Sequence, residues 1–182
     1  MDNIMKRNEI NGTFLSADPS LKNTALVWGT IKGGVVEPLG HMISTTDKVK
    51  GEKVMIDMVN RARKTIENII ATINAVNPDF TFSEIPSGSQ SLSGAKSAAL
   101  SCAYIALLGT DCIISTPGEV KKATGNKRTA TKEDMMDWAD KQFPDYDFPR
   151  KKDGTMVKGK CEHICDALAV VEAGILKMVS KN

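Results

Sequence analysis

Alternating apolar and polar residues mark the first part of the chain as a run of strands. This pattern, rich in Val, Ile, Thr and Leu, is typical of strands and covers residues 13–18, 24–31 and 35–43. A Lys-Gly-Gly sequence at 32–34 predicts a tight turn, so we expect the second and third strands to be antiparallel. Two shorter apolar runs, 79–84 and 111–115, predict a fourth and a fifth strand.

Helical periodicity dominates the rest of the chain. Apolar residues recur every three or four positions in the segments 52–76, 91–108, 131–143 and 162–179. Residues 144–160 are polar and basic, which indicates a loop. Because crossovers between parallel strands are right-handed, this order predicts an α/β fold. Its five-stranded mixed sheet would have the strand order 3-2-1-4-5 and helices on both faces.

Composition limits the class of protein without adding a function. The 182 residues are 41% hydrophobic and 25% charged, with a net charge of +2, as in ordinary soluble domains. We expect one domain over residues 1–182, with a flexible N-terminus over 1–11. The sequence shows no apolar run long enough to span a membrane and no secretory signal. We therefore expect a cytoplasmic protein without a membrane partner, with its four cysteines reduced.

Two carboxylates are predicted to meet at one edge of the sheet. Asp18 ends the first predicted strand and Glu84 ends the fourth, and neighbouring strands lie about 4.8 Å apart. In the last predicted helix, His163 and Asp166 are three residues apart and share a face. Packed across the sheet, this helix would complete a set of donors that suits Mg²⁺ or Mn²⁺. Taken singly, Asp18 also fits a turn former before proline, and Glu84 a solvated strand end.

Four segments resemble the motif blocks of the RuvC-type Holliday junction resolvases, in the order and at nearly the spacing of that family. The segments are FLSADPSLKNTALVW, FTFSEIP, STPGEVKKATGNKRTATKEDM and HICDALAV. The resemblance implies a ribonuclease-H-like fold and a homodimer. It also implies metal-dependent cleavage of four-way DNA junctions with two Mg²⁺ ions, for which Mn²⁺ can substitute.

The same resemblance assigns roles to individual residues. The family's acidic residues fall on Asp18, Glu84 and Asp166. Its fourth metal-binding position, aspartate in some members and histidine in others, falls on His163. Glu162, next to it, stays open as an alternative fourth ligand. These assignments imply that the four residues of the predicted acidic edge bind the metal ions and act in catalysis.

Basic residues gather in two parts of the chain. Lys121 and Lys132 occupy the positions of two family lysines, and Lys132 is expected to act in catalysis as well as in DNA binding. The first cluster comprises Lys121, Lys122, Lys127, Arg128 and Lys132, and the second comprises Arg150, Lys151 and Lys152. Phosphate contacts from such clusters give salt-sensitive affinity without reading sequence. The alternative is that both clusters simply face water.

The sequence departs from the family pattern in two places. Family members often carry an aromatic residue shortly after the second acid, whereas Pro86, Ser87 and Gly88 follow here. We therefore expect little preference for a particular cleavage sequence. The loop 144–160 is longer than in the bacterial enzymes, which favours a bacteriophage member. The helix 91–108 is rich in Gly, Ser and Ala, and it is our candidate dimer interface.

Other functions remain compatible with these residues. A flap or other branched-DNA nuclease, or an RNA–DNA hybrid nuclease, would use the same chemistry on a different substrate shape. A non-catalytic junction-binding protein would keep the fold. Cys161 and Cys165 could together touch a zinc ion, although structural zinc needs four ligands. An actin-like or sugar-kinase ATPase is disfavoured because the sequence lacks a second glycine-rich phosphate loop.

Overall fold

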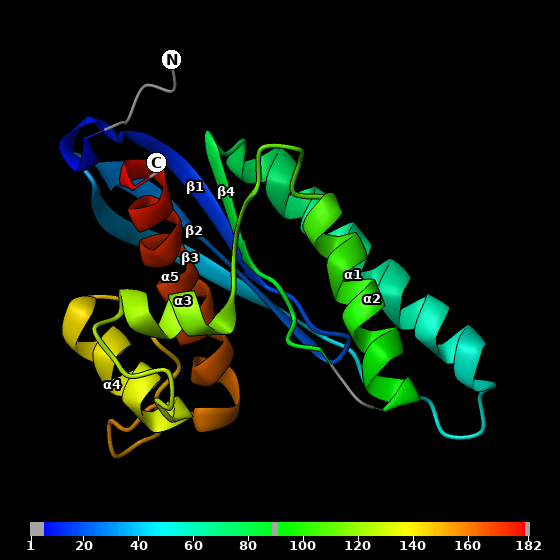
Figure 1. Ribbon diagram of the computed structural model, residues 1–182. Coiled ribbons are helices and arrows are strands. Elements are labelled where there is room, and N and C mark those ends of the chain that lie inside the picture. The colour runs from blue at the N-terminus through cyan, green and yellow to red at the C-terminus, as the bar shows by residue number, and fades with distance from the viewer. Residues whose placement is uncertain (1–5, 89–90, 181–182) are drawn as a thin grey trace.

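A mixed sheet runs through the centre of the computed structural model, which describes residues 6–88 and 91–180 (Figure 1). Its strands are β1 (Gly12–Asp18), β2 (Asn23–Lys32), β3 (Val35–Thr45), β4 (Phe80–Glu84) and β5 (Ile113–Ser115). They are ordered β3-β2-β1-β4-β5. The pairs β3–β2 and β2–β1 are antiparallel, whereas the pairs β1–β4 and β4–β5 are parallel. Within the described residues, the strand order predicted from the sequence is confirmed.

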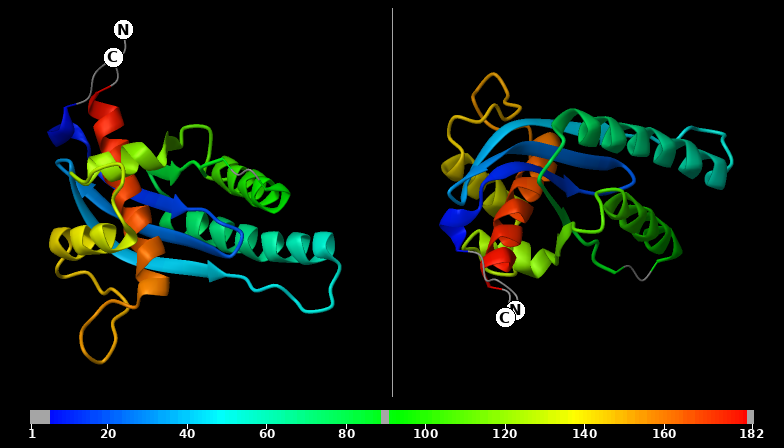
Figure 2. Two further views of the ribbon diagram at one scale, coloured as in Figure 1. Left: turned by 60° about the horizontal axis from the view of Figure 1, so that its bottom comes forward. Right: turned by 90° about the horizontal axis from the view of Figure 1, so that it is seen from above.

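Helices cover both faces of the sheet, as predicted. They are α1 (Val54–Val76), α2 (Leu92–Ala106), α3 (Pro117–Ala123), α4 (Lys132–Gln142) and α5 (Lys158–Val179). The pair α1 and α2 lies on one face, and α5 crosses the other with α3 and α4 packed beside it (Figures 1 and 2). Strand alternation separates the two cores: Phe14 faces α5, whereas Leu15 faces α1 and α2. Among the described helices, none is both long and apolar enough to cross a membrane.

Two close contacts hold α5 against β1 and β4. Ser16 Oγ donates a buried hydrogen bond of 2.7 Å to the carbonyl oxygen of Ala167. At Gly174, a Cβ atom would stand 2.1 Å from Cδ1 of Phe82, so only glycine permits this approach to β4. Because α5 runs opposite in direction to β1, its first turns lie at the carboxyl ends of β1 and β4.

The sequence-based prediction missed α3 and began α5 at residue 162 instead of 158. Local signals for α3 are present in the sequence. Pro117 occupies its first turn, and Thr116 and Glu119 form a capping box. The helix was overlooked because it is only seven residues long, too short for apolar periodicity to reveal.

Part of the N-terminal segment belongs to the folded core. Residues Arg7–Glu9 form a short 3₁₀ helix, η1, and Ile10 is fully buried. Both lie inside the segment 1–11 that we expected to be flexible. Residues 1–5 of that segment lie outside the described residues.

One side of α1 is apolar but exposed. Its exposed apolar residues include Val54, Met55, Ile56, Val59 and Ile70. Its buried side mixes the core residues Ala62 and Ile69 with polar groups such as Thr65, whose hydroxyl lies 3.3 Å from that of Ser44. Apolar periodicity therefore located this helix but did not indicate which of its sides faces the sheet.

Candidate active site

The predicted acids of β1 and β4 lie side by side at one edge of the sheet. The two strands are parallel, and the residues just before Asp18 and Glu84 pair in register. The two acids therefore occupy equivalent positions at neighbouring strand ends. Two residues earlier, Ser16 and Phe82 contact α5. Since residues i and i+2 of a strand share a face, Asp18 and Glu84 face that helix as well.

His163 reaches Asp18 from the beginning of α5. Its Nδ1 lies 3.0 Å from Oδ2 of Asp18, and its Nε2 lies 3.3 Å from Nδ2 of Asn23. A carboxylate can only accept, so Nδ1 carries the proton that points to Asp18, whereas Nε2 lies between Asn23 and Glu162, 3.7 Å from Oε1 of Glu162. This hydrogen bond to Asp18 raises the pKa of His163 despite partial burial. Asn23 was not among the predicted site residues, although it lies within the first motif block.

Asp166 completes a group of poorly compensated acids. Burial, and then the charge of Asp18, raise its pKa to about 7. Burial, followed by the charges of Asp18 and Asp166, raises the pKa of Glu84 to about 8. Burial and mutual repulsion therefore disfavour the ionised forms of these acids in the metal-free chain, and a bound cation would stabilise the ionised forms. It is also accessible, because the side chain of Asp18 remains 19% exposed.

Two lysines predicted from the family resemblance border these acids. Lys132, the first residue of α4, forms an ion pair of 2.7 Å with Glu162. Lys121 in α3 donates a hydrogen bond of 2.8 Å to the carbonyl oxygen of Ala130. The charge of Lys121 opposes the rise in the pKa of Glu84. His163 contacts Asp18 directly, whereas Glu162 pairs with Lys132, so His163 is the better placed of the two candidates for the fourth ligand.

The remaining predicted DNA-binding residues differ in their freedom to bind. All of them are exposed, namely Lys122, Lys127, Arg128, Arg150, Lys151 and Lys152. Arg150 is already engaged, because its guanidinium forms an ion pair with Asp140 and donates to the carbonyl oxygen of Gly154. Arg150 therefore stabilises its loop, and its guanidinium is less free than the lysine side chains to contact a phosphate.

The donor set fits a hard divalent cation. Three carboxylates and one imidazole come together from β1, β4 and α5, and such oxygen-rich donor sets suit Mg²⁺ or Mn²⁺. Within residues 6–88 and 91–180, no three such groups already surround one point as in a formed metal site. Asp18 instead hydrogen-bonds His163, so metal binding requires that hydrogen bond to open or rearrange.

The cysteine pair offers no second metal site in the described part of the chain. Cys161 and Cys165 are fully buried in the core beneath α5. No group of three possible ligands includes them among the described residues. Burial raises the pKa of both thiols, and Cys161 Sγ donates to the carbonyl oxygen of Pro149. The structure thus favours free, protonated thiols.

Solved structures share this architecture. A structure of Thermus thermophilus RuvC in complex with a Holliday junction substrate matches with a TM-score of 0.67 and 16% sequence identity, over 89% of this chain and 92% of that chain. The chain has the RuvC fold. A second structure of Thermus thermophilus RuvC matches with a TM-score of 0.63 and 15% identity, over 88% of this chain and 92% of that one. No protein-family model matches the sequence, and no curated protein shows significant sequence similarity to it. The RuvC fold confirms the fold class that the motif blocks implied.

Proposed function

We propose that the protein is a metal-dependent endonuclease that resolves four-way DNA junctions. The observation that carries this proposal is the meeting of Asp18, Glu84 and Asp166 at the ends of two parallel strands. Two findings support the choice of substrate. A structure with the same fold is of Thermus thermophilus RuvC in complex with a Holliday junction substrate, and the four motif blocks follow the order found in the resolvases.

The residues of the site would act in distinct ways. Asp18, Glu84 and Asp166, together with His163, would hold two Mg²⁺ or Mn²⁺ ions. When bound, such ions lower the pKa of water and stabilise charge that develops on the phosphate. In the metal-free chain Nδ1 of His163 hydrogen-bonds Asp18, and His163 would ligate a metal ion or orient the attacking water once that hydrogen bond opens. Lys132 would add positive charge beside the scissile phosphate.

Side-by-side cleavage assays test the choice of substrate. A four-way junction, a three-way junction, a flap and an RNA–DNA hybrid of matched sequence are each incubated with Mg²⁺, Mn²⁺ or Ca²⁺. We expect cleavage of the four-way junction with Mg²⁺ and Mn²⁺, and products with 5′-phosphate and 3′-hydroxyl ends. Faster cleavage of the flap or the hybrid would reassign the substrate. Tight junction binding without cleavage of any substrate would favour a non-catalytic binding protein.

We also propose that the active form is a homodimer that covers the groove between α1 and α2. The groove has a volume of about 510 Å³. Its apolar lining residues are Met55, Met58, Val59, Ala62, Ile66, Ala99 and Leu100. Met55 and Val59 remain 58% and 53% exposed, so a second copy would remove apolar surface from water. A twofold dimer would also present two sites to the two symmetric strands of a junction.

The small residues of α2 are only partly available to such an interface. Ser101 is buried against its own chain, where its Oγ donates a hydrogen bond of 3.0 Å to the carbonyl oxygen of Pro19. Ala99, by contrast, is exposed and lines the groove. The proposed interface therefore combines the exposed side of α1 with part of α2, rather than α2 alone.

Sedimentation tests the dimer. Val59→Glu places a charge in the groove and should yield monomers. Ala71→Glu places the same charge on an exposed position of α1 that does not line the groove, and it should leave the dimer intact. A wild-type protein that sediments as a monomer at micromolar concentration, with and without junction DNA, would contradict the proposal.

A further inference from the structure

The loop between α4 and α5 contains a small, ordered β-hairpin. Arg150 and Met156 form an antiparallel bridge, and the amide of Lys151 donates to the carbonyl oxygen of Thr155 at 2.8 Å. At the turn, Gly154 N donates to Lys151 O at 3.0 Å, and Gly154 has a φ of +83°. A positive φ at this position suits glycine and fixes the turn. The hairpin is therefore a formed element within the loop.

Side chains reinforce this hairpin from within. Asp153 Oδ1 accepts hydrogen bonds from the amide and the hydroxyl of Thr155, at 2.9 and 2.6 Å. The guanidinium of Arg150 spans the turn to the carbonyl oxygen of Gly154, at 3.0 Å, and forms an ion pair with Asp140 of α4. Asp153 and Arg150 are thus used to hold the hairpin's shape and to tie it to α4.

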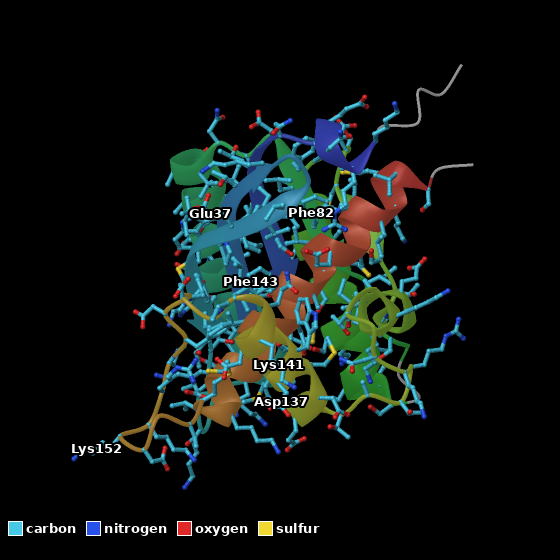
Figure 3. All side chains as sticks on the ribbon, turned by 90° about the vertical axis from the view of Figure 1, so that its left-hand side faces the viewer. Glu37, Phe82, Asp137, Lys141, Phe143 and Lys152 are labelled. Atoms are coloured by element: carbon cyan, nitrogen blue, oxygen red, sulfur yellow. The ribbon has the colours of Figure 1, made fainter. Side chains whose placement is uncertain are left out.

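The apex of the hairpin carries two lysines whose side chains do not hold its shape. Lys151 and Lys152 are exposed, and neither ammonium group forms a salt bridge with any residue in 6–88 or 91–180. Figure 3 shows Lys152 at the outer tip of the loop, away from the body of the molecule. The hairpin therefore presents two exposed lysines on a braced support, although the charge of Lys151 also acts on Asp153, whose pKa it helps to lower.

The hairpin projects from the end of the molecule that carries the candidate active site. Its loop leads into Lys158, the first residue of α5, and projects from the body of the molecule (Figure 2). His163 follows five residues later on that helix, a distance of about 8 Å along its axis. DNA seated at the acids would continue past the site as a duplex arm, with one negative charge per about 1.7 Å of helix axis.

We propose that this hairpin is a preformed arm that places Lys151 and Lys152 against backbone phosphates of the duplex flanking the cleavage site. This inference rests on the proposed function for its location and goes beyond it by naming a separate contact with the duplex arm. The contact is electrostatic, so it adds affinity without sequence preference. Arg150 contributes by holding the hairpin, not by binding phosphate.

Salt dependence of DNA binding tests the inference. Binding of the full-length protein to a fluorescent four-way junction, and to a linear duplex with one arm's sequence, is measured in Ca²⁺ over a range of salt concentrations. The double variant Lys151→Gln/Lys152→Gln should reduce the slope of log affinity against log salt by about 2 on both probes. The affinity loss should be the same for arms of unrelated sequence.

A control variant removes two lysine charges elsewhere, one of which, that of Lys32, is paired with Glu37. Lys32 ends β2, at the far end of the sheet from Asp18, and Lys6 precedes η1, which is bonded to the turn after β2. The variant Lys6→Gln/Lys32→Gln should leave the slope unchanged. Equal slopes for the wild type and the Lys151/Lys152 variant, or equal losses in the two double variants, would overturn the inference.

A further variant separates the structural role of Arg150 from the general effect of positive charge on DNA binding. Asp140→Asn removes the partner of Arg150 but makes the protein more positive, so general electrostatics predicts tighter binding. If the hairpin contacts DNA only while Arg150 holds its shape, this variant should bind DNA more weakly. Tighter binding would overturn that role for Arg150.

Different results would refute the resolvase function and the hairpin contact. A wild type that neither binds nor cuts junctions refutes the resolvase, while the duplex probe still reports on the hairpin.

Discussion

Without metal ions, the protein should lose stability as the pH rises, and Mg²⁺ should restore it. In the folded chain the pKa of Glu84 is raised to about 8 and that of Asp166 to about 7, above their ordinary values of about 4.3 and 3.9. Between the ordinary and raised values, the folded state binds protons that the unfolded chain has released. The free energy of unfolding therefore falls as the pH rises through this window.

The expected change can be worked from these pKa values. Raising the pH from about 6 to about 8 should remove about 2 kcal/mol through Glu84 and about 1 kcal/mol through Asp166. For a chain of 182 residues, each kcal/mol corresponds to about 2–4 °C in the unfolding temperature. We therefore expect the metal-free protein to unfold about 6–12 °C lower at the higher pH.

Thermal unfolding in chelator and in Mg²⁺, at both pH values, measures this effect. Metal binding must displace the protons held by the acids, so Mg²⁺ should stabilise the protein more at the higher pH. Glu84→Gln should remove most of the pH dependence in chelator. Glu52→Gln changes an exposed carboxylate that precedes α1 and does not line the groove, and it should leave the pH dependence as it is.

Two results would refute this reasoning. An unfolding temperature in chelator that does not fall between the two pH values would show that the acids are not held in a strained, protonated state. Equal stabilisation by Mg²⁺ at both pH values would show that the ion binds somewhere other than at these acids.

The other predictions concern the helix contact, the histidine and the cleavage pattern. Gly174→Ala should destabilise the protein by about 1–3 kcal/mol in chemical denaturation, because the added Cβ meets the ring of Phe82. Adding Phe82→Leu should recover part of this loss of stability, and an unchanged stability of Gly174→Ala would contradict the close contact. Asn23→Ala should slow junction cleavage about tenfold or more while junction affinity stays the same, because the amide no longer holds Nε2 of His163; an unchanged rate would remove Asn23 from the site. Since no aromatic residue closely follows Glu84 in the sequence, mapped cuts on mobile junctions should spread over several positions near the branch, and a single strict cleavage sequence would contradict this.

Much of the fold could be predicted because its signals are local or topological. Alternation located the first three strands and short apolar runs the last two, and the turn at 32–34 together with right-handed crossovers then gave their order. The same reasoning predicted that Asp18 and Glu84 would meet, because both end parallel neighbours. His163 and Asp166 could be added because helical spacing places them on one face.

The missing parts depend on partners that are distant in the sequence. Asn23 meets His163 across 140 positions, and no local pattern reveals such a pair. Arg150 looked like a free cation because its pairing with Asp140 forms only when the hairpin folds back on α4. The exposed apolar side of α1 could not be predicted either, since periodicity does not tell a core face from an interface.

Cleavage of a four-way junction by the wild type and by Asp18→Asn, in Mg²⁺, tests the central claim most directly. We expect the wild type to cut the junction. Asp18→Asn should not cut it, because a metal ligand has been removed. It should bind the junction at least as tightly, because a negative charge near the phosphate has been removed. Binding of both proteins is measured in Ca²⁺ to show that the variant is folded. Cleavage by Asp18→Asn within about tenfold of the wild-type rate, or about 1.4 kcal/mol in the barrier, would contradict the account.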